Sequence, residues 1–129
     1  MKIERNPREV HAPLASYTHQ IEIGPGGRWL MLSGQIGMRP DGSVPDAAAD
    51  QIAIALENIR YNLAAASMTV TDIVKLTIYL VGEIDSDTRR TALANFLGTH
   101  APCMTLMYVS ALASPALRVE IDATAWSPT

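Results

Sequence analysis

The side chains able to do chemistry are few in this chain of 129 residues, and their spacing excludes several common sites. His11, His19 and His100 lie far apart in sequence and form no metal-binding motif. Ser33 lacks the G-x-S-x-G pattern of a nucleophilic elbow, and no Asp/His pair accompanies it at a recognisable spacing. Cys103, the only cysteine, has neither a C-x-x-C partner nor a basic neighbour in sequence. The sequence therefore favours neither a metal centre nor a reactive serine or cysteine.

Two features remain as possible parts of a site. Glu120 lies in the segment 117–126, where apolar and polar residues alternate, so it is either a solvated or paired carboxylate or a group that acts on a ligand. The second feature is the stretch APCMTLMYVS at 101–110, a predicted strand opened by a proline. Met104 and Leu106 share one face of this strand, which carries almost no polar alternation. It is either a plain core strand or a site strand without a charge.

The composition limits the class of protein. With 48% hydrophobic and 18% charged residues, the chain is expected to be one globular domain spanning 1–129. A net charge of -3 and a pI of about 5.5 give no electrostatic footprint for nucleic acid. No apolar run is long enough for a membrane span, and the polar start shows no secretory signal. The single cysteine makes a cytoplasmic location the natural expectation.

The elements that would position these residues follow from hydrophobic periodicity. We expect strands at 18–23 and 28–36, joined into a hairpin by the turn cluster GPGG. A helix is expected to open at Pro45 and Asp46, because an apolar stripe then recurs at steps of four, three and four residues: Ile52, Leu56, Ile59, Leu63. The remaining predictions are a strand at 73–81, a helix at 86–98 that ends at Gly98, and strands at 101–110 and 117–126.

This order predicts an α+β fold with a single mixed sheet, and the fold class is expected to have six strands in that sheet. Each helix has one apolar stripe, so both helices are expected on one face of the sheet. The run at 73–81 nevertheless has the composition of a strand that is covered on both faces. Further copies of the same chain would supply the missing cover, so the pattern indicates a homo-oligomer.

Several motifs resemble those of the Rid family, the reactive intermediate deaminases that are also described as endoribonuclease L-PSP-like. The stretches LMLSGQIGMRPDGSVPDAAADQIAIALENI and DIVKLTIYL follow the family's order. AP…SYTH at 12–19 resembles its N-terminal motif, and VEIDATA at 119–125 resembles its closing strand. The similarity spans nearly the whole chain. It implies a chorismate-mutase-like fold and a homotrimer with ligand clefts between neighbouring subunits.

The resemblance also implies an activity and a set of site residues. Rid proteins hydrolyse enamines and imines such as 2-aminoacrylate to keto acids and ammonia, without metal or cofactor. Tyr17, Ser33 and Gly34 match positions that line the family's cleft, and Glu120 matches the group that would position a water. In deaminating members an arginine follows the motif's proline by two residues and holds the substrate carboxylate.

This chain departs from that pattern at three positions. Met104 stands where the arginine is expected, and Leu106 replaces a cysteine that is common in the family. Arg90 falls where many members carry an asparagine on the second helix, so the positive charge is expected either to have moved to this helix or to be a solvated surface residue. Methionine offers an apolar wall instead of a charge-assisted contact, which is worth about 1.5–3 kcal/mol.

Three functions stay open from the sequence. The first is a hydrolase of an enamine, an imine or a related small metabolite that is not a standard 2-aminoacrylate deaminase. The second is a non-catalytic trimeric protein that binds a small molecule. The third, a ribonuclease, is disfavoured by the acidic charge balance.

Overall fold

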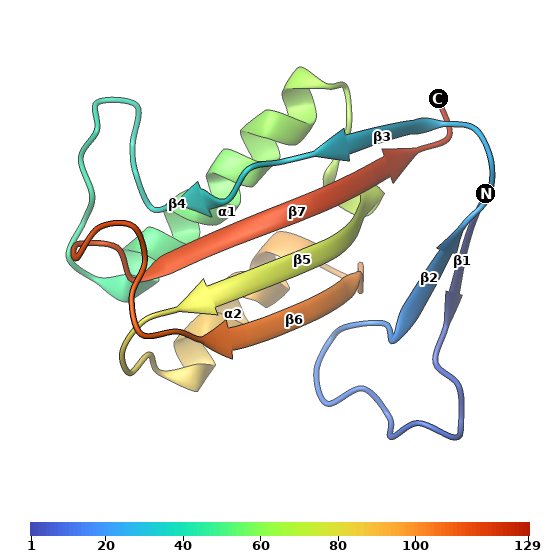
Figure 1. Cartoon of the computed structure of the whole chain (residues 1–129), viewed down its shortest axis with the longest axis horizontal. Helices are drawn as coiled ribbons and strands as arrows, with labels where there is room; N and C mark the ends of the chain where they lie inside the picture. Colours follow the sequence, from blue (N-terminus) through green and yellow to red (C-terminus); the bar gives the residue numbers. More distant parts are fainter.

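The computed structural model describes residues 1–129 and shows an α+β fold in which two helices cover one face of a five-stranded sheet (Figure 1). The strands are β1 Lys2–Arg5, β2 Gln20–Ile23, β3 Arg28–Met31, β4 Gln35–Ile36, β5 Ile73–Leu80, β6 Cys103–Tyr108 and β7 Val119–Ser127, and the helices are α1 Ala48–Ala65 and α2 Ser86–Leu97. The fold class predicted from the sequence is confirmed, but the main sheet has five strands instead of the expected six, because β1 and β2 pair apart from it.

The main sheet has the order β3-β7-β5-β6, with β4 pairing alongside β3 on β7. β7 runs antiparallel to β3, β4 and β5, whereas β5 and β6 are parallel. The parallel pair needs a crossover, and α2 supplies it between β5 and β6. The edges of the sheet are therefore β3 with β4 on one side and β6 on the other.

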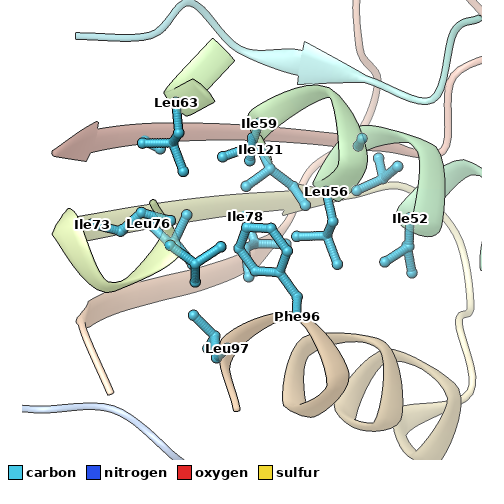
Figure 2. Close-up of a cluster of buried hydrophobic side chains, with 14 of the residues drawn as sticks. Ile52, Leu56, Ile59, Leu63, Ile73, Leu76, Ile78, Phe96, Leu97 and Ile121 are labelled. Carbon is cyan, nitrogen blue, oxygen red and sulfur yellow. The ribbon is translucent and has the colours of Figure 1, made fainter. Parts of the chain in front are cut away.

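The hydrophobic core lies between the helices and the sheet (Figure 2). Ile59 and Leu63 on α1 are fully buried, as the apolar stripe predicts. They meet alternate residues of the two central strands, such as Leu76 on β5 and Ile121 on β7. Phe96 and the adjacent Leu97 complete this core from α2, which ends at Gly98 as expected.

The predicted hairpin between the strands expected at 18–23 and 28–36 is wrong. β2 pairs with β1 instead, and these two strands form a separate ribbon beyond the end of the main sheet where β5 and β6 begin (Figure 1). The turn explains the difference, because Gly26 and Gly27 both have positive φ and the indole of Trp126 donates a hydrogen bond to the carbonyl of Gly26. A side chain at Gly27 would collide with Trp126, so the turn is fixed against the end of β7 and directs the ribbon away from β3.

The second face of the main sheet carries no helix. From β5 it presents Lys75, Thr77 and Tyr79, which are half-buried, while the intervening residues of the strand are buried in the core. Within one chain β5 is thus covered on one face, and cover of its second face by further copies stays a prediction. We call this helix-free side the open face.

The first helix begins later than predicted, at Ala48 rather than at Pro45. The chain bends at Asp46 and Ala47 before the helix begins, and the side-chain amide of Gln51 donates a hydrogen bond back to the carbonyl of Pro45. Neither helix combines the length and the hydropathy that a membrane span requires.

Candidate functional site

The strongest candidate for a catalytic group is Glu120, on the open face of β7. Its carboxylate lies directly against the backbone at Gly34, in the segment between β3 and β4, where any side chain at residue 34 would collide with it. Glu120 is half-buried, and no ion pair or side-chain hydrogen bond within the chain involves it. A carboxylate that is positioned but unpaired can accept a hydrogen bond from a water or a ligand.

Ser33 and Gly34 reach this place because the chain between β3 and β4 follows β7. Leu32 donates a backbone hydrogen bond to Ala123, and Ile36 is the strand partner of Glu120. Ser33 is exposed beside Gly34, as a residue that contacts a ligand should be. The structure therefore brings Glu120, Gly34 and Ser33 together, and their role in a ligand cleft stays a prediction.

Tyr79 and Asp122 are the polar neighbours of Glu120 on the open face. Tyr79 on β5 is the strand partner of Glu120, and its hydroxyl lies 3.5 Å from Oδ2 of Asp122. The negative charge of Asp122 raises the pKa of the Tyr79 phenol, with smaller contributions from desolvation, the hydrogen bond and Glu120. The phenol is therefore held protonated, as a possible hydrogen-bond donor beside the carboxylates.

Met104 and Leu106 lie on the opposite side of the sheet from Glu120. They are the register partners of Leu76 and Ile78, and like them they face the helices and pack against the core. Both side chains are only half-buried, because β6 is an edge strand. Within one chain these two predicted ligand-binding residues therefore do not meet Glu120.

Of the two adjacent arginines on α2, Arg89 and not Arg90 packs beside this strand. Arg89 lines a small hollow between α2 and the sheet together with Leu93 and Leu106, whereas Arg90 is exposed on α2. Helix periodicity allowed either residue to border the buried stripe, and only the packing of α2 distinguishes them. The expected role of Arg90 in a cleft stays a prediction, since one chain brings it to none of the other predicted site residues.

Tyr17 lies in the loop that connects β1 to β2, far along the chain's surface from Glu120. Its hydroxyl accepts a hydrogen bond from the backbone N–H of Leu14, and the next residue, Thr18, hydrogen-bonds to Pro102 just before β6. Tyr17 therefore lies near the beginning of β5 and β6, whereas Glu120 pairs with Tyr79 near the end of β5. A single chain does not bring these two side chains together.

A polar hollow on the helix side is not part of this group of residues. It has a volume of about 630 Å³ and lies between α1 and α2. Its walls include Glu57, Arg60 and Phe96, with the Arg60 guanidinium stacked 5.1 Å from the Phe96 ring centre. No three His, Cys, Asp or Glu side chains gather anywhere in the chain so that they could hold a metal ion.

Gln51 is a buried polar residue that supports the site indirectly, and the sequence did not identify it as buried or as a hydrogen-bonding residue. Gln51 is fully buried at the start of α1, where its side chain donates hydrogen bonds to the carbonyls of Pro45 and Ala116 and accepts one from the N–H of Arg118. It thereby ties α1 to the residues that lead into β7 and Glu120. Its place in the Q…ALENI helix motif was the only signal in the sequence.

The profile of the endoribonuclease L-PSP family matches residues 8–127. The putative reactive intermediate deaminase TdcF of Escherichia coli is 30% identical over 116 residues, which are 87% of each chain, and its serine-bound crystal structure aligns with a TM-score of 0.71. The rat 2-iminobutanoate/2-iminopropanoate deaminase is 30% identical over 88% of this chain and 82% of its own.

The structure of a Rid protein of unknown function, YyfB from Yersinia pestis, aligns with a TM-score of 0.85 over 98% of both chains, at 26% sequence identity. The family profile covers most of the sequence, and these relatives cover most of its length. The motifs quoted from the sequence and the fold that they predicted thus have one explanation: the chain belongs to the endoribonuclease L-PSP family, the Rid family.

Proposed function

We propose that this protein is a hydrolase of an enamine, an imine or a related small metabolite, and that it works in clefts between the copies of a homotrimer. The observation that supports this most directly is the unpaired carboxylate of Glu120 against Gly34, with Ser33 exposed beside it. The names of the rat and Escherichia coli relatives support the same reaction class.

In the proposed reaction Glu120 accepts a proton from a water while the water oxygen attacks the imine carbon. Glu120 passes this proton to the imine nitrogen, which gives the carbinolamine. The hydroxyl proton of the carbinolamine then moves to the nitrogen, the C–N bond breaks to release ammonia and the C=O bond forms, so an imine and one water give a carbonyl compound and ammonia. An enamine first takes a proton on carbon to become the imine. Water is the only co-reactant, so the proposal involves no metal and no cofactor.

The homotrimer is part of the proposal because one chain does not assemble the site. Tyr17 and Glu120 lie at opposite ends of β5, and Met104 and Leu106 face away from Glu120. In an assembly, the β6 edge and the Tyr17 loop of one copy can lie beside Glu120 of the next. The open face also needs cover, because Trp29 and Met31 at its edge are 55% and 73% exposed.

We infer that the substrate is not a standard 2-aminoacrylate-type acid held by an arginine on β6. Met104 stands at that place, and a methionine cannot make a charge-assisted hydrogen bond to a carboxylate. The lone cysteine fits a reducing cytoplasm as the place of action. The same absence of the arginine favours the second candidate function, a non-catalytic trimer that binds a small molecule in its clefts.

Ammonia release from freshly generated 2-iminopropionate tests the two functions against each other. A hydrolase should release ammonia faster than buffer does, but more slowly than relatives that carry the arginine. The matched variant Glu120→Gln keeps the shape of the side chain and removes its basicity, so the rate should fall about 100-fold or more. If neither 2-iminopropionate nor imines without a carboxylate are hydrolysed above the buffer rate, the hydrolase proposal fails and the binding protein stands.

A further inference from the structure

Arg89 has an unusual environment for a cation on a surface helix. Its Nε atom is buried and has no hydrogen-bond partner, the only buried side-chain nitrogen or oxygen in the chain with this property. The hollow beside it has a volume of about 10 Å³, and seven of its eight lining residues are hydrophobic. A water there would lack the two or more polar partners that hold buried waters in place. The guanidinium of Arg89 is therefore shielded from water at its Nε atom.

The two terminal nitrogens of Arg89 are not buried in this way, and no ion pair or hydrogen bond within the chain uses them. The side chain lies beside Leu93, Leu106 and Ile78 in the small hollow between α2 and the sheet. Such a side chain is fixed by its apolar stem while its fork of N–H donors stays free. This arrangement suits a planar anion that accepts two parallel hydrogen bonds.

The acidic groups near α2 do not satisfy this charge. Asp85 caps the helix and accepts hydrogen bonds from the backbone and hydroxyl of Thr88. Arg118, the other cation near the end of β5, is already used by the carbonyls of Val81 and Glu83. Arg89 is thus a cation without a partner in this hollow, and Leu106 on the edge strand β6 is its neighbour.

We propose that Arg89 is the anchor for the anionic group of the ligand, a carboxylate, at the border of α2 and β6. The inference rests on the proposed function in one respect, because it places the ligand in the same intersubunit cleft; the carboxylate on that ligand is what this inference adds. The charge that β6 lacks at Met104 is then supplied by the helix that packs against that strand. Arg89 acts by binding and orienting the ligand, and takes no part in proton transfer.

Binding of pyruvate, measured by calorimetry on the intact oligomer, tests the proposal without any turnover. Pyruvamide, which has the same shape and no charge, is the matched probe. The wild-type protein should bind pyruvate at least about tenfold more tightly than pyruvamide, as expected for one charge-assisted pair. Arg89→Met should remove this preference and leave the affinity for pyruvamide unchanged. Arg90→Met, one residue further on the same helix, should keep the preference.

The variant Arg89→Lys tests whether Arg89→Met acts only by disturbing the structure. It keeps the charge but not the fork of donors, so it should bind pyruvate more weakly than the wild type and more tightly than Arg89→Met. The proposal is overturned if the wild type does not distinguish pyruvate from pyruvamide, or if Arg89→Met distinguishes them as the wild type does. Ammonia release that is unaffected by Arg89→Met would keep the hydrolase and remove this anchor. A preference for pyruvate without any ammonia release would keep this anchor and remove the hydrolase.

Discussion

The carboxylate of Glu120 occupies the space that a side chain at Gly34 would need. Gly34 does not have a positive φ, so its role here is not an unusual backbone conformation. The small size of residue 34 instead lets the carboxylate lie against the chain between β3 and β4. The position of Glu120 is therefore set by two segments that are distant in sequence, and a minimal change at one should displace the other.

Gly34→Ala should lower activity far more than stability. The atoms that a methyl group would meet belong to the flexible end of Glu120, so the side chain can move aside without unfolding the protein. A displacement of about 1 Å at a catalytic group can reduce a rate on the order of 100-fold, whereas the free energy of unfolding should change by less than about 1 kcal/mol. Ammonia release and urea unfolding measure the two effects. Gly24→Ala, where the nearest atom lies at 3.4 Å, is the control and should change neither.

A charge in the middle of the open face should break the oligomer. Thr77 on β5 lies between Thr105 on β6 and Asp122 on β7, so Thr77→Arg adds a long charged side chain where the sheets of neighbouring copies are expected to meet. Light scattering should then show a monomer at concentrations where the wild type is a trimer. Ala64→Arg, on the exposed side of α1, should leave the trimer intact. A monomeric wild type at micromolar concentration would contradict the assembly itself.

Gln51→Met should destabilise the protein strongly although the two side chains are similar in size. The change leaves the N–H of Arg118 and the carbonyls of Pro45 and Ala116 without their partner in a buried place. Each lost partner costs about 1–3 kcal/mol, so we expect a loss of roughly 3 kcal/mol in the free energy of unfolding. Urea unfolding at fixed protein concentration measures it. Gln20→Met on exposed β2 is the control, and an equal effect there would refute the role of Gln51.

Periodicity predicted the elements whose burial repeats along the sequence. The stripe from Ile52 to Leu63 determines α1, and the alternation from residue 117 onward determines β7, because each pattern matches one buried face. β1 was missed because it contains three charged residues in four. Strand pairing failed for a different reason: the partner of β2 depends on how the turn contacts Trp126, and such a contact has no local signature.

The candidate site shows the same difference between features that repeat along the sequence and contacts that depend on packing. Alternation along β6 correctly placed Met104 and Leu106 on one face, yet only the register with β5 shows that this is the core face. The likeness to the Rid family indicated Glu120 and Gly34, and their contact could not be derived from spacing. The choice between Arg89 and Arg90 was open in the sequence because both border the apolar stripe, and it depends on the side-chain packing of α2.

Tyr79 should titrate above its ordinary range, and Asp122 should be the reason. The nearby negative charge of Asp122 raises the pKa of the phenol, since ionising Tyr79 would place two like charges together. Asp122→Asn removes that charge and should move the titration of Tyr79 back toward a pKa of about 10. Near-ultraviolet absorbance of tyrosinate measures it, with Tyr79→Phe identifying the signal among the four tyrosines. The control Asp46→Asn, in the exposed loop before α1, should leave the curve unchanged.

The same shift predicts how stability changes in alkali. The folded protein holds the Tyr79 proton more tightly than the unfolded chain, because its pKa is raised by folding. The resulting stabilisation is complete below the unfolded pKa of about 10 and is lost as the pH rises through the folded value. Between these two values the wild type should therefore lose stability more steeply with pH than Asp122→Asn does. Urea midpoints measured across this range check the slope, and parallel slopes for the two proteins would show that Asp122 does not control the proton on Tyr79.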